Sequence, residues 1–367
     1  MESVKNSVVN GLYCLVDWLE FTIDGLNLDV PKPCIDSNKR GEVNHWLSFL
    51  GLQADMFDDL DKGGYGYKSS CKHMYDNIWC YYDGADDMGI HIRCSGSSVG
   101  SLLFQVKASY MVNDLPSDFG RGSRAYDVGD NDIEDILYMF IEKVRSIGHF
   151  TRIDLAIDDI GCKYYTVAKL GKLVSNGNVV SKMKKCQEIK DKSLTAKLFG
   201  HTVYFGSRQS DVYIRVYDKR AEQELDIPWT RWELEIKHDK ADEVAKMLVD
   251  SRDLGHITFG VLSNYIRIVR LEHSRRTNCP LDDTWQAFVY GCEKVPIRIL
   301  KIDKTIADKQ RWIEHQCMPT LAGLIVANGG DISFIRDKLE LHFDRLSGKD
   351  KKMYQAELER SEKVEKH

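Results

Sequence analysis

Long apolar runs are missing from this sequence. Nowhere do the ~18 consecutive apolar residues of a membrane-spanning helix occur. The first residues, MESVKNSVVNGLYCLVDWLEFTI, also lack the basic region and the unbroken apolar segment of a secretion signal. We therefore expect a soluble, cytoplasmic protein.

Paired cysteines are missing as well. The ten cysteines are scattered and include no C-x-x-C pair, so their spacing does not indicate a zinc site or a redox motif. Disulfides are rare in cytosolic proteins. We expect reduced cysteines that pack like small apolar residues.

Several catalytic motifs are absent. The sequence has no G-x-x-x-x-G-K-[ST], no H-E-x-x-H and no G-x-S-x-G, and the segment GGYGYKSS lacks the spacing of a phosphate-binding loop. These absences argue against a P-loop NTPase, a zinc protease of that type and an α/β-hydrolase.

The length and composition are those of a folded protein. With 367 residues, 43% of them hydrophobic and 29% charged, the chain can form one large domain with an appendage. We predict a first domain over residues 1–295 and a helical C-terminal region over 296–367.

Charge is unevenly distributed. The formal net charge of −5 argues against a protein that coats nucleic acid through its overall charge. Residues 163–197, however, contain nine lysines against Glu188 and Asp191. This local basic patch fits DNA binding at a limited site, with Lys184 and Lys185 as candidate contacts. A solvated lysine-rich hairpin is the alternative.

The periodicity of apolar residues predicts a mixture of strands and helices. Strands are expected at 15–23, 79–82, 89–94, 102–106, 151–157, 201–205, 212–217 and 230–237. A helix is expected over 131–144, with Asn131 and Glu134 as a capping box, and another in ADEVAKMLV with Asp239 as its cap. After about residue 295 only helices are expected, broken at Pro319, Gly329–Gly330 and Gly348. The predicted fold is α+β, with a largely antiparallel central sheet flanked by helices and a C-terminal helical region.

Three predicted strands, TRIDLAID, DVYIRVYDK and TRWELEIK, divide their side chains in the same way. Residues two apart on a strand point to the same side of the sheet, and one side of each strand is apolar. The other side carries Arg152, Asp154 and Asp158, then Tyr213, Arg215, Tyr217 and Lys219, then Arg231, Glu233, Glu235 and Lys237. Any half-buried sheet has a polar side, but solvation alone does not select carboxylates, tyrosines and arginines. If the strands are neighbours, this side is a site.

These residue types suit phosphoryl transfer on a nucleic acid. Mg²⁺ or Mn²⁺ prefers oxygen ligands, which Asp154, Glu233, Glu235 and Asp158 can supply. His91, in GIHIRC, is either a further ligand or a hydrogen-bonded strand histidine. A tyrosine hydroxyl, with a pKa of about 10, needs cationic neighbours or a metal to attack a phosphate.

Basic residues on the same side can hold the DNA backbone, because arginine binds phosphate oxygens bidentately. The turn GSRQS adds hydroxyls and backbone N–H groups that fit a phosphate cradle, although a plain hairpin turn has the same composition. The candidate DNA contacts are Arg152, Ser207, Arg208, Arg215, Lys219, Arg231 and Lys237.

Three blocks resemble the Rep_trans family of replication initiation factors, which includes plasmid rolling-circle initiators and relaxases of integrative conjugative elements. They are FTRIDLAIDD (150–159), TVYFGSRQSDVYIRVYDKRAEQ (202–223) and WTRWELEIK (229–237), within a resemblance over roughly 10–295. The resemblance implies a sheet distantly like that of HUH endonucleases and sequence-specific nicking of one DNA strand at an origin.

The resemblance also implies roles for residues. The family nucleophile, a tyrosine that becomes joined to the 5′ phosphate, falls on Tyr217 rather than on Tyr213, which shares its face. A divalent metal is implied too. This chain has Arg93 where many relatives have a glutamate, and it lacks the paired histidines of many nickases, so its ligand set would depend more on Asp154, Glu233 and Glu235.

The leading hypothesis is a metal-dependent nicking and closing enzyme that starts rolling-circle replication or conjugative transfer of a mobile element. Its partner would be origin DNA, and the helical tail would serve origin recognition, dimerisation or contact with a helicase or coupling protein. Two alternatives remain open: a DNA-binding replication or regulatory protein that does not nick, and a nuclease that uses the carboxylates with water.

Overall fold

The computed structural model describes residues 7–9, 11–24, 39–85, 88–112, 133–192, 198–220, 227–289, 295–297, 310, 313–333, 335 and 351. The chain divides into two compact units, Met1–Ile299 and Leu300–His367. Within the described residues, no helix has the length and apolar character needed to cross a membrane.

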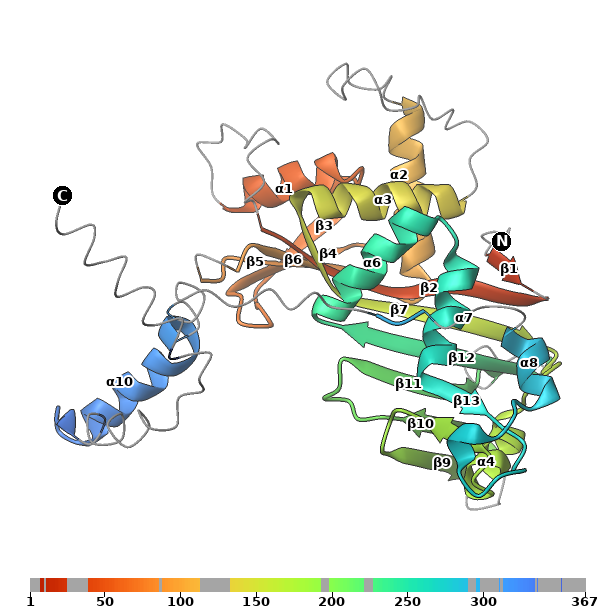
Figure 1. Ribbon diagram of the computed structural model, residues 1–367. Coiled ribbons are helices and arrows are strands. Elements are labelled where there is room, and N and C mark those ends of the chain that lie inside the picture. The colour runs from red at the N-terminus through yellow and green to blue at the C-terminus, as the bar shows by residue number, and fades with distance from the viewer. Residues whose placement is uncertain are drawn as a thin grey trace, which may run out of the picture. The chain divides into compact units, whose positions relative to one another are not determined.

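A large antiparallel sheet forms the centre of the first unit (Figure 1). Its eleven strands follow the order β3–β4–β5–β6–β2–β7–β12–β11–β10–β9, and β1 pairs with β2 outside this path. The strands are β1 (Ser7–Val9), β2 (Leu12–Ile23), β3 (Phe57–Leu60), β4 (Ser69–His73), β5 (Ile78–Tyr82), β6 (Ile90–Ser95), β7 (Gly148–Ile160), β9 (Cys186–Lys192), β10 (Leu198–Phe205), β11 (Val212–Asp218) and β12 (Trp229–Lys237). A separate ribbon pairs β8 (Val179–Ser181) with β13 (Ile266–Ile268).

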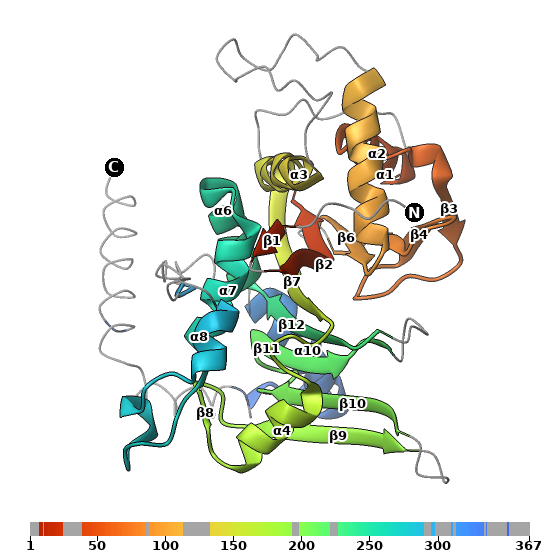
Figure 2. The ribbon, with the colours of Figure 1, turned by 90° about the vertical axis from the view of Figure 1, so that its right-hand side faces the viewer.

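Helices lie against this sheet. In Figure 2, α6, α7 and α8 follow one another along one side of it, and α4 lies beside β9 and β10. The first unit contains α1 (Lys39–Phe49), η1 (Ala54–Met56), α2 (Ser98–Val112), α3 (Ile133–Ile147), α4 (Val167–Ser175), α6 (Asp239–Ser251), α7 (Leu254–Tyr265), η2 (Arg276–Asn278) and α8 (Asp283–Val289). The α+β fold with an antiparallel sheet is therefore as predicted.

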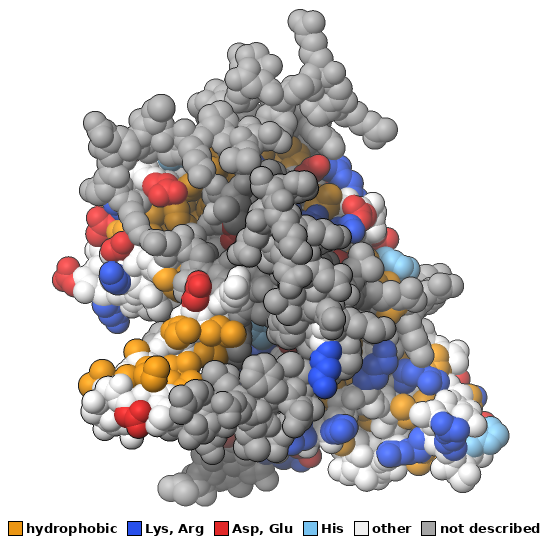
Figure 3. Space-filling model, turned by 60° about the vertical axis from the view of Figure 1, so that its left-hand side comes forward, with side chains coloured by type: hydrophobic (Ala, Val, Ile, Leu, Met, Phe, Trp, Pro, Cys, Tyr) orange, Lys and Arg blue, Asp and Glu red, His pale blue; other side chains and the backbone are white. Residues whose placement is uncertain are grey.

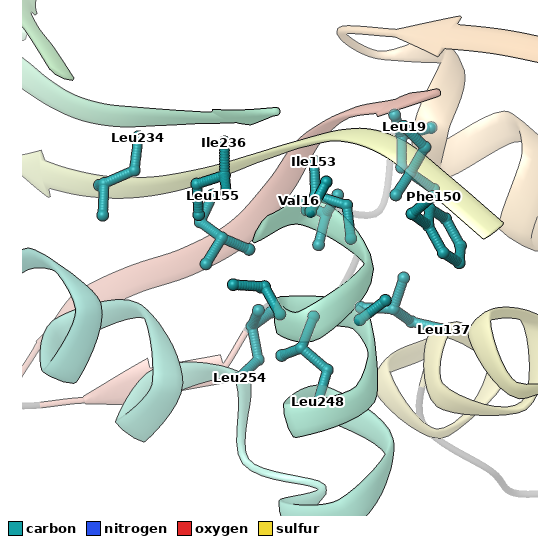
Figure 4. Close-up of a cluster of buried hydrophobic side chains, with 14 of the residues drawn as sticks. Val16, Leu19, Leu137, Phe150, Ile153, Leu155, Leu234, Ile236, Leu248 and Leu254 are labelled. Atoms are coloured by element: carbon teal, nitrogen blue, oxygen red, sulfur yellow. The ribbon is translucent and has the colours of Figure 1, made fainter. Parts of the chain in front are cut away.

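The hydrophobic core lies between the sheet and the helices (Figure 4). Leu137 of α3, Leu248 of α6 and Leu254 of α7 face Ile153 and Leu155 of β7. Fully burying such a side chain contributes about 1.5–3 kcal/mol relative to exposure. Because alternate residues point to opposite sides, the polar residues of β7, β11 and β12 lie on the other face of the sheet, which we call the site face.

One predicted strand, 102–106, is wrong. These residues lie inside α2, where Val99, Leu102, Leu103 and Val106 are buried. Those four positions have the i, i+3, i+4, i+7 spacing of a helix, which a five-residue window cannot distinguish from strand alternation.

The two predicted helices of the first unit are present, with different ends. The apolar side chains of 131–144 are buried in α3, and Asn131 of the expected capping box lies outside the described residues. Asp239 is the first residue of α6 and not its cap. His238 takes the cap position without a side-chain hydrogen bond.

The second unit is helical where it is described. A π-helical turn, η3 (Ile313–Cys317), leads into α10 (Met318–Ala327). Pro319 does not break a helix as predicted, because it lies in the first turn of α10, where no N–H is needed for an intrahelical bond. Gly329 and Gly330 follow the helix with positive φ, as helix-ending glycines do. Gly348 lies outside the described residues.

The described cysteines are all free thiols. Cys14, Cys71, Cys80, Cys94 and Cys279 are buried, in agreement with a packing role, whereas Cys186 is exposed. Cys34 and Cys292 lie outside the described residues.

Candidate active site

The three strands with the charged face are neighbours, as the sequence interpretation required. β12 lies between β7 and β11, so Glu233 stands directly opposite Arg215, and Arg231 opposite Tyr217. On its other side, Glu235 stands opposite Asp154. Directly opposed side chains have Cβ atoms about 4.5–5.5 Å apart. The sheet therefore brings tyrosine, arginine and carboxylate groups from three segments into contact.

Tyr217 lies beside a carboxylate and two cations. Its hydroxyl donates a hydrogen bond to Glu233 Oε2 at 3.2 Å, and Arg215 donates to Glu233 Oε1. Lys219 Nζ lies 5.6 Å from the centre of the Tyr217 ring, and Arg215 Cζ lies 6.0 Å from it. The phenol thus has a proton acceptor and positive charge on the same side of the sheet.

A second group of charges lies at the far end of β12. Arg152 holds Asp154 with two hydrogen bonds of 2.8 and 2.6 Å and also donates to Glu235 Oε2 at 3.0 Å. Lys237 Nζ is 2.8 Å from Glu235 Oε1. Asp154 is fully buried and Glu235 is 6% exposed, so both carboxylates depend on these cations.

A third group is centred on Arg231, which is 5% exposed. Its guanidinium donates to both oxygens of Asp158 at 2.6 Å and to Asp17 Oδ1 at 2.6 Å. Asp17 lies on the site face by alternation with Tyr13 and Leu15, and the pairing of β2 with β7 then shifts between Val16 and Trp18, which brings Trp18 to the same face. A β-bulge of this kind redirects a side chain, and bulges are frequent beside active sites.

Burial and neighbouring charge shift several pKa values in opposite directions. Burial raises the pKa of Asp154 to about 8, although the Arg152 guanidinium opposes this rise. For Arg215 and Arg231, burial would lower the pKa, but the carboxylates of Glu233 and Asp158 outweigh it and raise the pKa of each. Both arginines therefore remain charged.

The predicted metal ligands do not form a metal-binding site in this arrangement. Asp154, Asp158, Glu233 and Glu235 each accept hydrogen bonds or ion pairs from arginine or lysine. Among the described residues, no group of three or more His, Cys, Asp or Glu side chains is placed to hold a metal ion. The carboxylates fit cation partners as they stand, and a metal would have to displace these.

His91 lies on the site face but away from these carboxylates. It pairs with Thr22 of β2, whereas Asp154 pairs with Trp18, four positions along the same strand. Its Nδ1 is 3.3 Å from Thr22 Oγ1, and its buried Nε2 has no hydrogen-bond partner and lies 4.0 Å from Glu20 Oε2. Burial lowers the pKa of His91, so its neutral form is favoured.

The candidate DNA contacts fall into two places. Arg152, Arg215, Lys219, Arg231 and Lys237 lie among the charged groups of the site face. Ser207 and Arg208 form the turn between β10 and β11, in which Gly206 has φ +94° and Lys237 Nζ donates to Arg208 O at 2.6 Å. Lys184 and Lys185 are exposed and precede β9.

Tyr213 differs from Tyr217 in its surroundings. It is 6% exposed, stacks on Tyr204 at 5.7 Å between ring centres, and lies under the Arg208 guanidinium. Burial raises its pKa, which disfavours the phenolate. Tyr217 is partly exposed, whereas Tyr213 is buried, so Tyr217 is the more accessible of the two tyrosines.

Sequence reasoning singled out His91 and Arg93 of β6 but missed the part of the site face contributed by β2, β4 and β5. A row of directly paired residues crosses the sheet from strand to strand. It runs through Lys72, Trp79, Arg93, Glu20, Arg152 and Lys237. Trp18 lies between two guanidiniums, 4.4 Å from Arg93 and 4.0 Å from Arg152. The alternation of Trp18, Glu20 and Thr22 in the sequence was the available signal.

Comparison with known proteins relates this chain to replication initiation factors. Residues 148–339, more than half of the chain, match the family model for replication initiation factors. The chain is 28% identical over 291 residues to the putative DNA relaxase NicK of Bacillus subtilis (strain 168), covering 76% of this chain and 75% of that protein. The structure of a rolling circle replication initiator protein from Geobacillus stearothermophilus is 27% identical and has a TM-score of 0.60, covering 79% of this chain and 100% of that one. On the family match, together with a fold shared with a solved initiator, the chain belongs to the Rep_trans family of replication initiation factors.

Proposed function

We propose that this protein nicks one strand of DNA at an origin and rejoins it, with Tyr217 as the nucleophile. The observation that carries the proposal is the hydrogen bond from the Tyr217 hydroxyl to buried Glu233, within a face that also presents Arg215 and Lys219. Relatives described as a DNA relaxase and as a rolling circle replication initiator support the same activity.

The side chains supply what a tyrosine needs to attack a phosphodiester. Tyr217 Oη attacks the scissile phosphorus while its proton passes to Glu233 Oε2, the acceptor 3.2 Å away. The bond from phosphorus to the 3′ oxygen breaks, so the 5′ phosphate is joined to Tyr217. The 3′ oxygen takes a proton from solvent and becomes a free 3′ hydroxyl, and attack by that hydroxyl on the phosphotyrosine rejoins the strand.

Cations around Tyr217 stabilise the charge that develops on the phosphate. Arg215 and Lys219 lie two positions before and after Tyr217 in the sequence, near its ring, and Arg231 pairs with it on β12. Donors fixed in place before the reaction are worth more than mobile ones, because no reorganisation is needed as the charge forms. The ion pairs of Arg215 and Arg231 provide this fixation.

A divalent metal, Mg²⁺ or Mn²⁺, is expected from the family. The described residues contain no group of three or more His, Cys, Asp or Glu side chains placed to bind one. The proposed metal ligands, Asp154, Glu233 and Glu235 with Asp158 or His91, are held by cations or lie apart. The attack and rejoining are therefore assigned to side chains of the protein, and a metal bound at these carboxylates would help to neutralise charge on the scissile phosphate.

The product of the reaction fits the start of rolling-circle replication or of conjugative transfer. Both begin with a nick that leaves a free 3′ hydroxyl, and the relatives include a putative DNA relaxase and a rolling circle replication initiator protein. We assign the origin DNA strand as substrate, and the helical C-terminal region as the place for a helicase, a coupling protein or a second copy of the chain to bind.

The direct test is substitution of Tyr217 by phenylalanine. Tyr217→Phe removes one oxygen, so we expect the protein to fold and bind single-stranded origin DNA as before but to form no covalent adduct. Tyr213→Phe is the matched control and should retain the adduct. Mass-shifted bands in denaturing gels, after incubation with Mn²⁺ and the oligonucleotide, report the outcome.

The same assay separates the alternatives. An adduct that persists in Tyr217→Phe and disappears in Tyr213→Phe would move the nucleophile to Tyr213. Cut DNA without an adduct in the wild type would identify a hydrolytic nuclease, and binding without cutting would identify a DNA-binding protein that does not nick.

A further inference from the structure

Two adjoining hollows lie beside the turn between β10 and β11. Their volumes are about 470 and 550 Å³, and both are lined by the segment 183–185. The first extends to η2 and the residue before it, and the second to residues 206–212 and α6. The two hollows share the segment 183–185 in their linings, and we refer to them together as the trough.

The lining of this trough is strongly basic. Its cations are Lys182, Lys184, Lys185, Lys240, Arg275 and Arg276, and Asp211 is the one acidic residue among its lining residues. We call these six cations the basic trough. This concentration of positive charge contrasts with the net charge of −5 of the chain. Figure 3 shows Lys and Arg side chains gathered toward the lower right of the face it draws.

Most of this charge is not neutralised by neighbouring residues. Lys240 Nζ lies 3.5 Å from Asp211 Oδ2, and Lys182 Nζ donates to the neutral amide of Asn264. Across the part of the chain that the structure describes, no ion pair involves Lys184, Lys185 or Arg275. An unpaired cluster of lysine and arginine in a groove attracts anions, because the groove concentrates its field.

The backbone holds the lysine segment in place. Lys182 N donates to Tyr265 O at 3.2 Å, Met183 N to Ser181 Oγ at 3.0 Å, and Gly206 N to Lys185 O at 2.9 Å. Gly206 has φ +94°, which favours glycine at this turn. The lysines are thus attached to a fixed wall, which lowers the entropic cost of binding a ligand.

The trough lies at the end of β11 away from Tyr217 and on the helix-covered side of the sheet, because its lining includes the core residues Phe205 and Val212. Lys237 of the site face donates to Arg208 O in the turn whose neighbours line the trough. Val212, at the trough, and Tyr217 are five residues apart on β11, or about 17 Å at the rise of an antiparallel strand. A DNA strand that leaves Tyr217 along β11 would therefore have to pass over the turn between β10 and β11 to reach the trough.

We propose that the basic trough binds the phosphate backbone of the DNA strand that continues from the nick, so that the protein holds this strand at two points. The proposal rests on the proposed nicking function and adds where the strand runs beyond the nick. Contacts to phosphate fix the position of DNA without reading its sequence. The binding should therefore depend on salt and not on base composition.

The test measures binding of fluorescein-labelled oligo(dT) of 20 nucleotides by anisotropy at several KCl concentrations. All variants carry Tyr217→Phe, so that no adduct forms. Lys184→Ala/Lys185→Ala removes two cations, and each lost phosphate contact lowers the slope of log K against log[salt] by about 0.7. We expect a slope smaller by roughly 1.4, which corresponds to about 25-fold weaker binding at 0.1 M relative to 1 M salt.

Three controls make the result interpretable. Lys246→Ala removes an exposed lysine of α6 outside the trough and should bind like the parent. Lys184→Arg/Lys185→Arg keeps the charge and should restore both slope and affinity, which a merely structural role would not require. Thermal unfolding verifies that each variant folds.

The outcomes distinguish this proposal from the nicking function. The proposal that the trough binds DNA is overturned if the salt slope of the double alanine variant is unchanged. It is also overturned if Lys246→Ala loses as much affinity as the double alanine variant. Failure of the parent to bind the oligonucleotide overturns it as well. Nicking stands or falls separately on the covalent adduct of the protein that retains Tyr217.

Discussion

Buried carboxylates beside arginines define the chemistry of the site at the level of single residues. Asp154 and Glu233 have no exposed surface, and each is held by a neighbouring guanidinium. Removing charges from water costs several kcal/mol per ion, which only close and well-oriented partners offset. Such pairs are weak evidence for a stabilising role, so their presence at the site favours a functional one.

Glu233 is the residue whose charge we expect to matter most for the rate of nicking. Glu233→Gln keeps the shape of the side chain but removes its ability to take the Tyr217 proton, which costs a rate factor of roughly 10²–10⁴. Single-turnover adduct formation measures it. Glu235→Gln is the matched control, because Glu235 bonds to Arg152 and Lys237. If both variants slow the reaction equally, Glu233 is not the proton acceptor.

Arg231 is expected to carry much of the stability of the site face. Arg231→Ala leaves Asp158 and Asp17 without their cationic partner. Removing one partner of a buried ion pair lowers the unfolding free energy by about 3–5 kcal/mol. Urea denaturation gives this quantity. Arg145→Ala breaks a pair with Asp242 in which both side chains are about 30% exposed, and should cost ~1 kcal/mol or less. Similar losses in the two variants would contradict this account.

The sequence predicted the composition of the site face but not all its residues. Alternation along a strand is local, so Arg231, Glu233 and Glu235 were identified without knowledge of the fold. Asp17 was not, because alternation along β2 does not show which distant strands lie beside it. Its partner Arg231 is separated from it by 214 positions in sequence.

At the level of elements, the order of strands decides what the site contains. β2 lies between β6 and β7, so the wing formed by β4, β5 and β6 joins the catalytic strands in one sheet. The sequence predicted β2, β5, β6, β7, β10, β11 and β12 but not this order, because pairing of distant strands depends on tertiary packing. The aromatic part of the site face was missed for the same reason.

The aromatic side chains of this wing suit unpaired bases. Trp79 and Tyr81 stack at 6.1 Å with 7° between their planes, Lys72 Nζ lies 5.3 Å from the Trp79 ring, and Tyr65 is 58% exposed. Base stacking on an aromatic ring contributes about 1–3 kcal/mol per base.

Trp79→Ala should therefore weaken binding of single-stranded oligonucleotides by about 1–3 kcal/mol, measured by fluorescence anisotropy. Phe104→Ala is the control, since Phe104 is an aromatic residue of α2 with 52% exposure and no place on the site face. Equal affinity of the Trp79 variant and the parent would show that the bases bind elsewhere.

At the level of the whole molecule, the charged groups and the sheet belong to one compact unit. Every described strand lies within Met1–Ile299, as do Tyr217 and the basic trough. The second unit, Leu300–His367, contributes η3 and α10 among the described residues. The sequence predicted a change to helices near residue 295 from composition, which is a local property.

A chain that ends at residue 299 should fold and form the covalent adduct. A compact unit with its own hydrophobic core can in principle fold alone, and this one contains the described core residues together with Tyr217 and Glu233. Urea unfolding should show one cooperative transition, and the adduct should form at the rate of the full chain on a short origin oligonucleotide. Tyr217→Phe in the truncated chain should again give no adduct.

A truncated protein that folds but forms no adduct would mean that Leu300–His367 takes part in the chemistry. One that does not fold would mean that the sheet depends on it. Retained adduct formation with reduced binding to a longer origin duplex would instead confine the second unit to recognition or to partner binding, which is the role proposed for it.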